Sequence, residues 1–168
     1  DLDTTRSKYA HQHIIKDFED RNIDILVGTQ MVTKGLDFDN VSLVGIINAD
    51  SMLNFPDFRS YERAYQLMAQ VAGRAGRKNK RGAVIIQAHN PEHTIIKQVL
   101  ANDYISMYQS QLADRKEFNY PPFCRLTELT VVHKEVNLVN EAARWLADEL
   151  RAHFGKRVFG PEFPVVSR

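Results

Sequence analysis

The octet Gln70-Val-Ala-Gly-Arg-Ala-Gly-Arg77 holds the residues best suited to phosphate chemistry. Arg74 and Arg77 are three residues apart, which places two guanidinium groups on one side of a helical turn. Planar guanidinium groups in this arrangement can grip phosphate oxygens through paired hydrogen bonds. Gly73 and Gly76 allow close backbone approach to a ligand. A solvated basic helix end is the commoner explanation for an isolated Arg-x-x-Arg, but the glutamine and the glycines favour a phosphate site.

A second polar segment, residues 28–38, offers hydrogen-bond donors and a positive charge to phosphates. Four side chains carry these groups: Thr29, Gln30, Thr33 and Lys34. Gly35 favours a tight turn that would present Asp37. A polar surface loop explains the four side chains if the segment is taken alone, and a turn or capping role explains Asp37 almost equally well.

Apolar patterns around both segments predict an α/β fold. Three apolar runs without alternation predict strands buried on both faces, as in a parallel sheet flanked by helices. They are residues 23–28, 41–47 and 83–86. Helices are predicted at residues 5–19, 58–72, 92–101 and 103–118. In the second helix, Tyr61, Tyr65 and Met68 recur at helical spacing and are expected in the core. This alternation of strands and helices is the layered α/β plan.

The paired prolines within Asn119–Phe123 mark a predicted boundary, because proline cannot continue a helix. Beyond them, residues 126–132 predict a strand and residues 137–154 predict an amphipathic helix stopped by Gly155. Residues 158–159 are interpreted as the start of another strand. One apolar set of the helix is expected to face inward: Leu138, Ala142, Trp145, Leu146 and Leu150.

Composition limits the classes of function. The 168 residues carry a net charge of +1 and a single cysteine, Cys124, so neither an internal disulfide nor a thiolate metal cluster is expected. Histidines without clustered carboxylates argue against a metal site; they are His11, His13, His89 and His93. No apolar run approaches the ~20 residues that cross a bilayer, so we expect a cytoplasmic protein without a membrane partner. Neither end looks like a natural terminus, so missing parts are expected.

The octet resembles motif VI of superfamily 2 helicases, and residues 28–38 resemble their motif V. This resemblance implies that Arg77 is an arginine finger, that Arg74 is its companion on the phosphates, and that Gln70 helps to sense the nucleotide. It implies ATP contacts at Gly35, Asp37, Gly73 and Gly76. It implies contacts with the DNA backbone at Thr29, Gln30, Thr33 and Lys34.

The wider pattern is similar to the PriA family of primosomal replication-restart DNA helicases (primosomal protein N′). The segments that carry this likeness are residues 24–31, 48–50, 56–63, 70–77 and 120–123. Arg59, Glu62 and Arg63 fit the family pattern, although an exposed pair within one helix explains them equally well. The resemblance implies an ATP-dependent, 3′-to-5′ helicase that acts on stalled replication forks and reloads the replication machinery.

The same resemblance implies ATP and Mg²⁺ held mainly by a first motor lobe, and zinc held by an insertion. This sequence contains neither a phosphate-binding Gly-x-x-x-x-Gly-Lys loop nor paired cysteines. The chain is therefore expected to begin after the zinc insertion and to be inactive by itself.

We predict a partial C-terminal RecA-like helicase lobe over residues 1–118, lacking its first strand or strands, and the start of a C-terminal α+β domain over residues 119–168. The expected partners are ATP and forked or single-stranded DNA. The full-length protein is expected to meet primosome and single-strand-binding proteins at the nucleoid. An unpaired edge of a parallel sheet also predicts self-association of the isolated chain, without physiological meaning.

Two alternatives stay open. Another superfamily 2 translocase, such as a recombination-fork helicase, would keep both motifs but should lack Tyr120-Pro-Pro-Phe123 and Pro56-Asp-Phe-Arg59. A non-enzymatic module would use residues 74–81 as a basic patch for nucleic acid or an acidic partner. That second alternative leaves the glutamine and the glycines of the octet unexplained.

Overall fold

The computed structural model describes residues 10–28, 41–73, 75 and 82–163. The chain divides into two compact units, residues 1–118 and residues 119–168. Their assignment to a helicase lobe and to the start of a C-terminal domain stays a prediction. In the part of the chain that the structure describes, no helix has both the length and the apolar character to cross a membrane.

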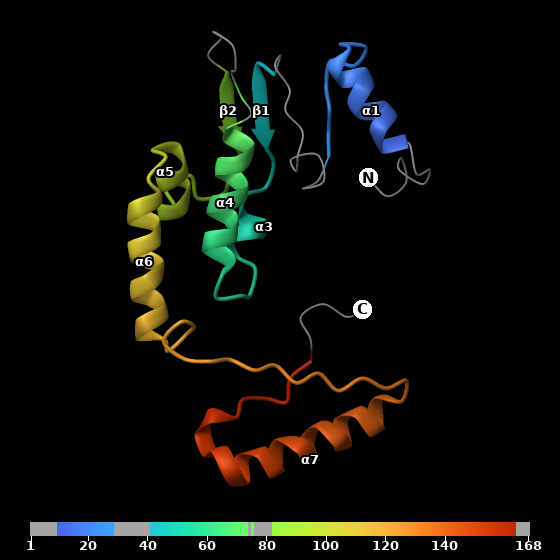
Figure 1. Ribbon diagram of the computed structural model, residues 1–168, viewed down its shortest axis with the longest axis vertical. Coiled ribbons are helices and arrows are strands. Elements are labelled where there is room, and N and C mark those ends of the chain that lie inside the picture. Colours follow the sequence, from blue (N-terminus) through green and yellow to red (C-terminus); the bar gives the residue numbers. More distant parts are fainter. Residues whose placement is uncertain (1–9, 29–40, 74, 76–81, 164–168) are drawn as a thin grey trace. The chain divides into compact units, whose positions relative to one another are not determined.

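The first unit is built on a small parallel sheet (Figure 1). Strand β1 (Leu43–Ile46) pairs with β2 (Ala83–Ile86), with Leu43 opposite Ala83 and Ile46 opposite Ile86. Both strands confirm the predicted apolar runs. The prediction of a strand at residues 23–28 is wrong, because this segment is paired to no strand that the structure describes. A strand needs a neighbouring strand to satisfy its backbone hydrogen bonds. Residues 23–28 have no such partner among the described residues, and their Ile25 and Val27 are 77% and 79% exposed.

Five helices of the first unit lie within the described residues. They are α1 (Ala10–Glu19), α3 (Asp50–Leu53), α4 (Ser60–Ala72), α5 (Thr94–Leu100) and α6 (Tyr104–Glu117). The predicted helices at 58–72, 92–101 and 103–118 are confirmed with slightly shorter bounds, whereas the short α3 was not predicted. Side chains cap two of them: the His93 ring nitrogen accepts the Ile95 N–H at 3.2 Å, and the Asp103 carboxylate accepts the Ser106 N–H at 3.0 Å.

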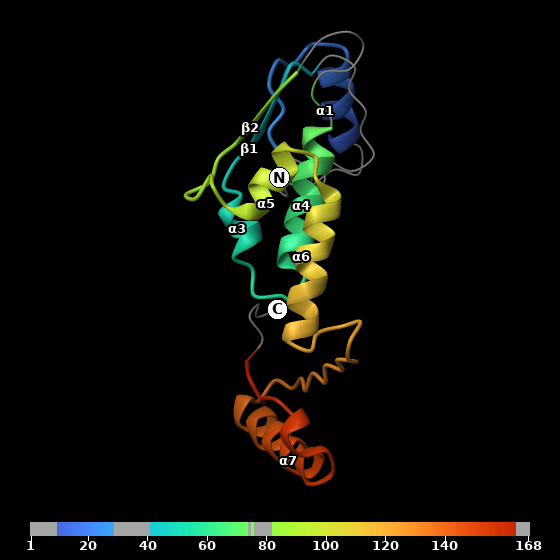
Figure 2. The ribbon, with the colours of Figure 1, turned by 90° about the vertical axis from the view of Figure 1, so that its left-hand side faces the viewer.

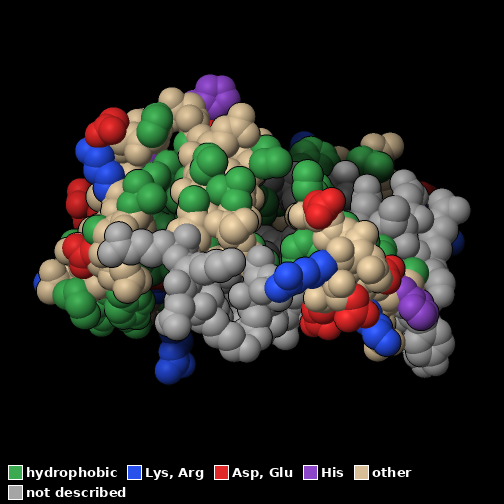
Figure 3. Space-filling view, turned by 90° about the horizontal axis from the view of Figure 1, so that it is seen from above, with side chains coloured by type: hydrophobic (Ala, Val, Ile, Leu, Met, Phe, Trp, Pro, Cys, Tyr) green, Lys and Arg blue, Asp and Glu red, His purple; other side chains and the backbone are tan. Residues whose placement is uncertain are grey.

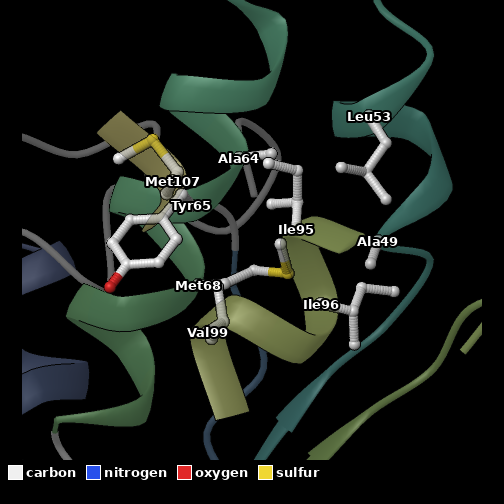
Figure 4. Close-up of a cluster of buried hydrophobic side chains, with 9 residues drawn as sticks. All are labelled: Ala49, Leu53, Ala64, Tyr65, Met68, Ile95, Ile96, Val99 and Met107. Carbon is white, nitrogen blue, oxygen red and sulfur yellow. The ribbon is translucent and has the colours of Figure 1, made fainter. Parts of the chain in front are cut away.

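A buried apolar cluster joins α4 to α3, α5 and α6 (Figure 4). Its members are Ala49, Leu53, Ala64, Tyr65, Met68, Ile95, Ile96, Val99 and Met107. Tyr65 and Met68 occupy the core, as predicted. Tyr61 does not, because it lies in the first turn of α4, where its ring packs edge-on against His93 and stays 37% exposed.

Helices α4 and α6 lie on one side of the sheet (Figure 2). Ile46 and Ile86 pack against the core cluster from the strands. Leu43 of β1 and Ile85 of β2 point to the other face of the sheet and are 55% and 59% exposed. The prediction of strands buried on both faces is therefore wrong for the described residues, since helices cover one face only. Apolar side chains also reach the surface in several places in the space-filling view (Figure 3).

The second unit contains α7 (Val136–Phe154) and the short helix η1 (Gly155–Arg157). Gly155 ends α7 with a φ of 60°, a conformation that glycine adopts without strain, as predicted. The strands predicted at 126–132 and 158–159 are wrong, because both segments are extended without strand pairing among the described residues.

The inward face predicted for α7 is corrected in part, because Ala142, Leu146 and Leu150 are half-buried whereas its other two residues are exposed. Ala147 is buried, but Trp145 is 65% exposed and Leu138 is 47% exposed. An amphipathic helix buries its apolar face only where a second layer covers it. The described residues of this unit leave much of that face uncovered, and apolar residues outside the helix such as Leu129 and Val132 are themselves 60% and 83% exposed.

Candidate nucleotide and nucleic-acid interface

The crossover between the two strands determines where α4 begins and ends. Strands β1 and β2 run in the same direction, and α4 carries the chain back between them (Figure 1). The first turn of α4 lies beyond the carboxyl ends of the strands, and the helix runs back from there toward the sheet, so that its later turns lie beside the strands (Figure 1). Because a helix rises about 1.5 Å per residue, the thirteen residues of α4 separate these two ends by roughly 20 Å.

The last turn of α4 carries the first half of the octet. Gln70 is exposed on the helix, and Gly73 is its C-cap. The Gly73 N–H donates to the carbonyl oxygen of Ala69 at 2.9 Å. A Cβ atom at Gly73 would lie 3.4 Å from that oxygen, which is an ordinary contact, and the φ of −65° is open to any residue, so the backbone at this position does not require glycine. Arg74, Gly76 and Arg77 lie outside the described residues.

The second polar segment lies wholly outside the described residues. This applies to Thr29, Gln30, Thr33, Lys34, Gly35 and Asp37. The residues that lead into it are described: the extended segment 23–28 runs in the same direction as β1 and β2 (Figure 1). The segment therefore runs toward the same end as the two strands.

At the carboxyl edge of the sheet, an aspartate and a histidine join the ends of the two strands. The Asp50 carboxylate accepts the backbone N–H of His89 at 2.9 Å and lies 3.3 Å from the His89 ring nitrogen Nδ1. The hydrogen bond from the His89 backbone lowers the pKa of Asp50, and the His89 side chain adds to this effect. Asn48, which precedes the pair, has a φ of 57° and accepts the Ser51 N–H through its side-chain oxygen at 3.3 Å.

Sequence reasoning missed the Asp50–His89 pair. The available signal was that polar residues directly follow both predicted strands, where α/β folds place their sites. The two residues are 39 positions apart, so only the parallel pairing of the strands brings them together.

A second charged cluster surrounds the start of α4. The Asp57 carboxylate lies 2.6 Å from an Arg63 guanidinium nitrogen and 3.9 Å from Nε of Arg59. One turn away, the Glu62 carboxylate pairs with Arg115 of α6 at 2.6 Å. The prediction of an exposed pair within one helix is therefore wrong. Arg59 and Arg63 both pair with Asp57, which lies in the chain before the helix. Glu62 pairs with a guanidinium group of the neighbouring α6.

Phe58 completes this cluster. The guanidinium carbon of Arg59 lies 4.8 Å from the centre of the Phe58 ring, and that of Arg115 lies 5.0 Å from it. Cations at this distance are attracted to the negative face of an aromatic ring. The ring therefore helps to orient two guanidinium groups.

Metal ligands do not gather in the described residues: no group of three His, Cys, Asp or Glu side chains there could hold an ion. Two of the described histidines have contacts of another kind. His89 contacts Asp50, and His93 caps α5.

Comparison with known proteins connects these features. The helicase conserved C-terminal domain family matches residues 1–79, which include both polar segments. The replication restart protein PriA of Bacillus subtilis is 45% identical over 100% of this chain, and that of Treponema pallidum is 41% identical over 100%. The PriA protein of Synechocystis is 43% identical over 89% of the chain. The chain belongs to the PriA family. It spans 21% of the Bacillus protein and 26% of the Treponema protein, so it corresponds to a limited part of these relatives.

Membership of the PriA family confirms the resemblance found in the sequence and the RecA-like α/β character of the first unit. The helicase family implies the use of ATP with Mg²⁺ and DNA as a partner. Several PriA proteins match the chain from end to end, past the helicase domain and through the second unit. This likeness along the whole chain argues against a different superfamily 2 translocase.

Proposed function

We propose that the full-length protein containing this chain is an ATP-dependent DNA helicase that moves 3′ to 5′ and restarts stalled replication forks. The likeness to PriA proteins over the whole chain is the observation that carries this proposal. In the full-length protein, primosome and single-strand-binding proteins would be its partners, and it would act on forked or single-stranded DNA in the cytoplasm at the nucleoid. Zinc would be held outside this chain.

In this proposal, the end of α4 faces a nucleotide held mainly by another lobe. Gln70 would sense the nucleotide through its exposed side-chain amide, and Gly73 would keep the backbone close enough for Gly76 and the arginines to reach the phosphates. Arg74 and Arg77 would bind phosphate oxygens through planar guanidinium groups. ATP with Mg²⁺ would supply the bond whose cleavage drives movement.

The segment after Gly28 would serve both ligands. Gly35 and Asp37 would contact the nucleotide, and the DNA backbone would be bound by Thr29, Gln30, Thr33 and Lys34. Hydroxyl, amide and ammonium groups of this kind position a nucleic-acid backbone without reading its bases. Support comes from the direction of residues 23–28, which run toward the same end as the two strands (Figure 1).

The decisive test is Arg77→Ala in the full-length protein. An arginine finger contributes roughly 10³ to 10⁵ in turnover, so DNA-stimulated ATP hydrolysis should fall by about that factor. ATP binding should weaken less, and Arg77→Lys should restore little activity because an ammonium group cannot reproduce the planar fork. The exposed Arg144 of α7 provides a matched control, Arg144→Ala. A folded Arg77→Ala protein with near-normal turnover would contradict the role of Arg77.

The isolated chain should not hydrolyse ATP above background, because it has neither a phosphate-binding loop nor the acidic ligands for Mg²⁺ that phosphoryl transfer requires. Turnover by the purified chain that disappears on substitution of Arg77 would overturn this expectation. The chain should also self-associate through exposed strand edges. Light scattering of a monomer at high concentration would refute that expectation.

A further inference from the structure

The first turn of α4 holds more positive charge than its neighbours neutralise. Arg59 and Arg63 share one carboxylate, that of Asp57. The acidic residue within the first turn, Glu62, is paired instead with Arg115 of α6. Two guanidinium groups therefore face a single available carboxylate, which leaves one positive charge in excess at this end of the helix.

These guanidinium groups are held in place and remain accessible. Arg63 contacts Asp57 at 2.6 Å, while Arg59 lies over the Phe58 ring and donates its backbone N–H to Asp57 at 2.8 Å. The side chains of Arg59 and Arg63 are nevertheless 52% and 50% exposed. These contacts use only part of the fork of N–H donors that each guanidinium carries. Such pre-oriented groups lose less conformational entropy when they bind a planar or tetrahedral anion.

The location of this cluster selects the ligand. The first turn of α4 lies beyond the carboxyl ends of the two parallel strands (Figure 1), on the side of the sheet where ligands of α/β folds bind. Residues 23–28 run toward the same end as the two strands and lead into the segment that we propose to bind DNA. The positive end of the α4 macrodipole also lies there and favours an anion.

From these observations we propose that Arg59 and Arg63 form a binding site for phosphates of the DNA backbone, with Asp57 as the carboxylate that a phosphate would displace. The site rests on the proposed function, because DNA is its ligand. It lies at the opposite end of α4 from Gln70 and Gly73. A single helix thus connects the DNA-binding edge to the nucleotide-binding end of the domain.

The test uses the full-length protein and a labelled single-stranded oligothymidylate, with binding measured by fluorescence anisotropy over a series of salt concentrations. Arg59→Gln/Arg63→Gln should weaken binding by about tenfold. Each lost single-strand phosphate contact lowers the salt slope by about 0.7, so the slope should fall by up to about 1.4. The control Lys116→Gln/Arg125→Gln removes the same charge from exposed positions elsewhere and should leave the slope unchanged.

Asp57→Asn separates phosphate binding from a structural role of the ion pairs. It removes the negative charge from the same two ion pairs but keeps both positive charges. If the arginines bind phosphate, Asp57→Asn should bind the oligonucleotide at least as tightly as the unsubstituted protein. If Asp57→Asn weakens binding as much as the arginine pair does, the contacts are structural and the proposal fails.

Two further outcomes keep this proposal distinct from the proposed function. An arginine double variant with unchanged affinity and salt slope, in a protein whose ATP hydrolysis is still stimulated by DNA, overturns the site and leaves the helicase assignment intact. A protein whose hydrolysis never responds to DNA overturns the helicase assignment itself. Loss of binding to an acidic peptide without loss of DNA binding would assign the arginines to a protein partner and also overturn the site.

Discussion

The two units use apolar side chains in opposite ways. In the first unit, α4 packs against α3, α5 and α6, and Met68 and Ala64 are completely buried. In the second unit, α7 is the longest helix that the structure describes, yet Ala147 is its one buried residue and Trp145 is 65% exposed. Helix length and amphipathic pattern are therefore insufficient for burial. A second layer of structure must be present to receive the apolar face.

The largest expected effect that tests this comparison is Met68→Ala. The side chain is fully buried among α4 and α5, so its removal leaves a cavity in close-packed surroundings. We expect a loss of about 2–5 kcal/mol in the free energy of unfolding of the first unit. Urea denaturation followed by circular dichroism measures it. A loss well under ~1 kcal/mol would mean that the core is not tightly packed.

Removal of the cap of α6 should have a smaller effect. The Asp103 carboxylate accepts the Ser106 N–H, so Asp103→Ala leaves a helix N-terminus uncapped and should cost about 1 kcal/mol. Asp103→Asn provides the control, since asparagine caps helices about as well as aspartate. Equal losses for the two variants in thermal melts would show that the cap contributes nothing.

The stability of the first unit should also depend on pH, with a smaller effect. Hydrogen bonds from the side chain and backbone of Ser106 lower the pKa of Asp103 in the folded state. A lowered folded pKa favours the ionised form, so this contribution to stability is present above the ordinary value of about 4. It is lost as the pH falls through the folded value. Asp103→Asn should therefore flatten the stability profile between about pH 5 and pH 2, and an unchanged slope would refute the role of this carboxylate.

The smallest effect is expected in the second unit. Because Trp145 is mostly exposed, Trp145→Ala should change stability by less than about 0.5 kcal/mol. Trp145 is the single tryptophan of the chain, so its fluorescence reports on α7 alone. Emission typical of a solvated indole, readily quenched by acrylamide, is expected. A blue-shifted, protected indole would show that another layer covers α7 and would remove the contrast between the two units.

Elements with a local cause could be predicted from the sequence. The apolar run at 83–86 became β2, and the apolar spacing of Tyr65 and Met68 marked α4, because these patterns reflect the geometry of the element itself. Elements that depend on distant partners were mispredicted. Residues 23–28 have the composition of a buried strand, but no described strand pairs with them. The exposure of Trp145 likewise depends on which layer covers α7.

By itself, the sequence determined the family and the order of the two polar segments that we propose to bind phosphates, since these depend on which residues occur and how they are spaced. Only the tertiary structure decided which charges meet. Arg115 reaches Glu62 across two helices, and Asp50 reaches His89 across two strands. The chain crosses from β1 through α4 to β2, which makes the two strands parallel and brings Asp50 next to His89. The same crossover places the two ends of α4 far apart. Spacing along the chain carries no record of such contacts, because packing brings together residues that are far apart in sequence.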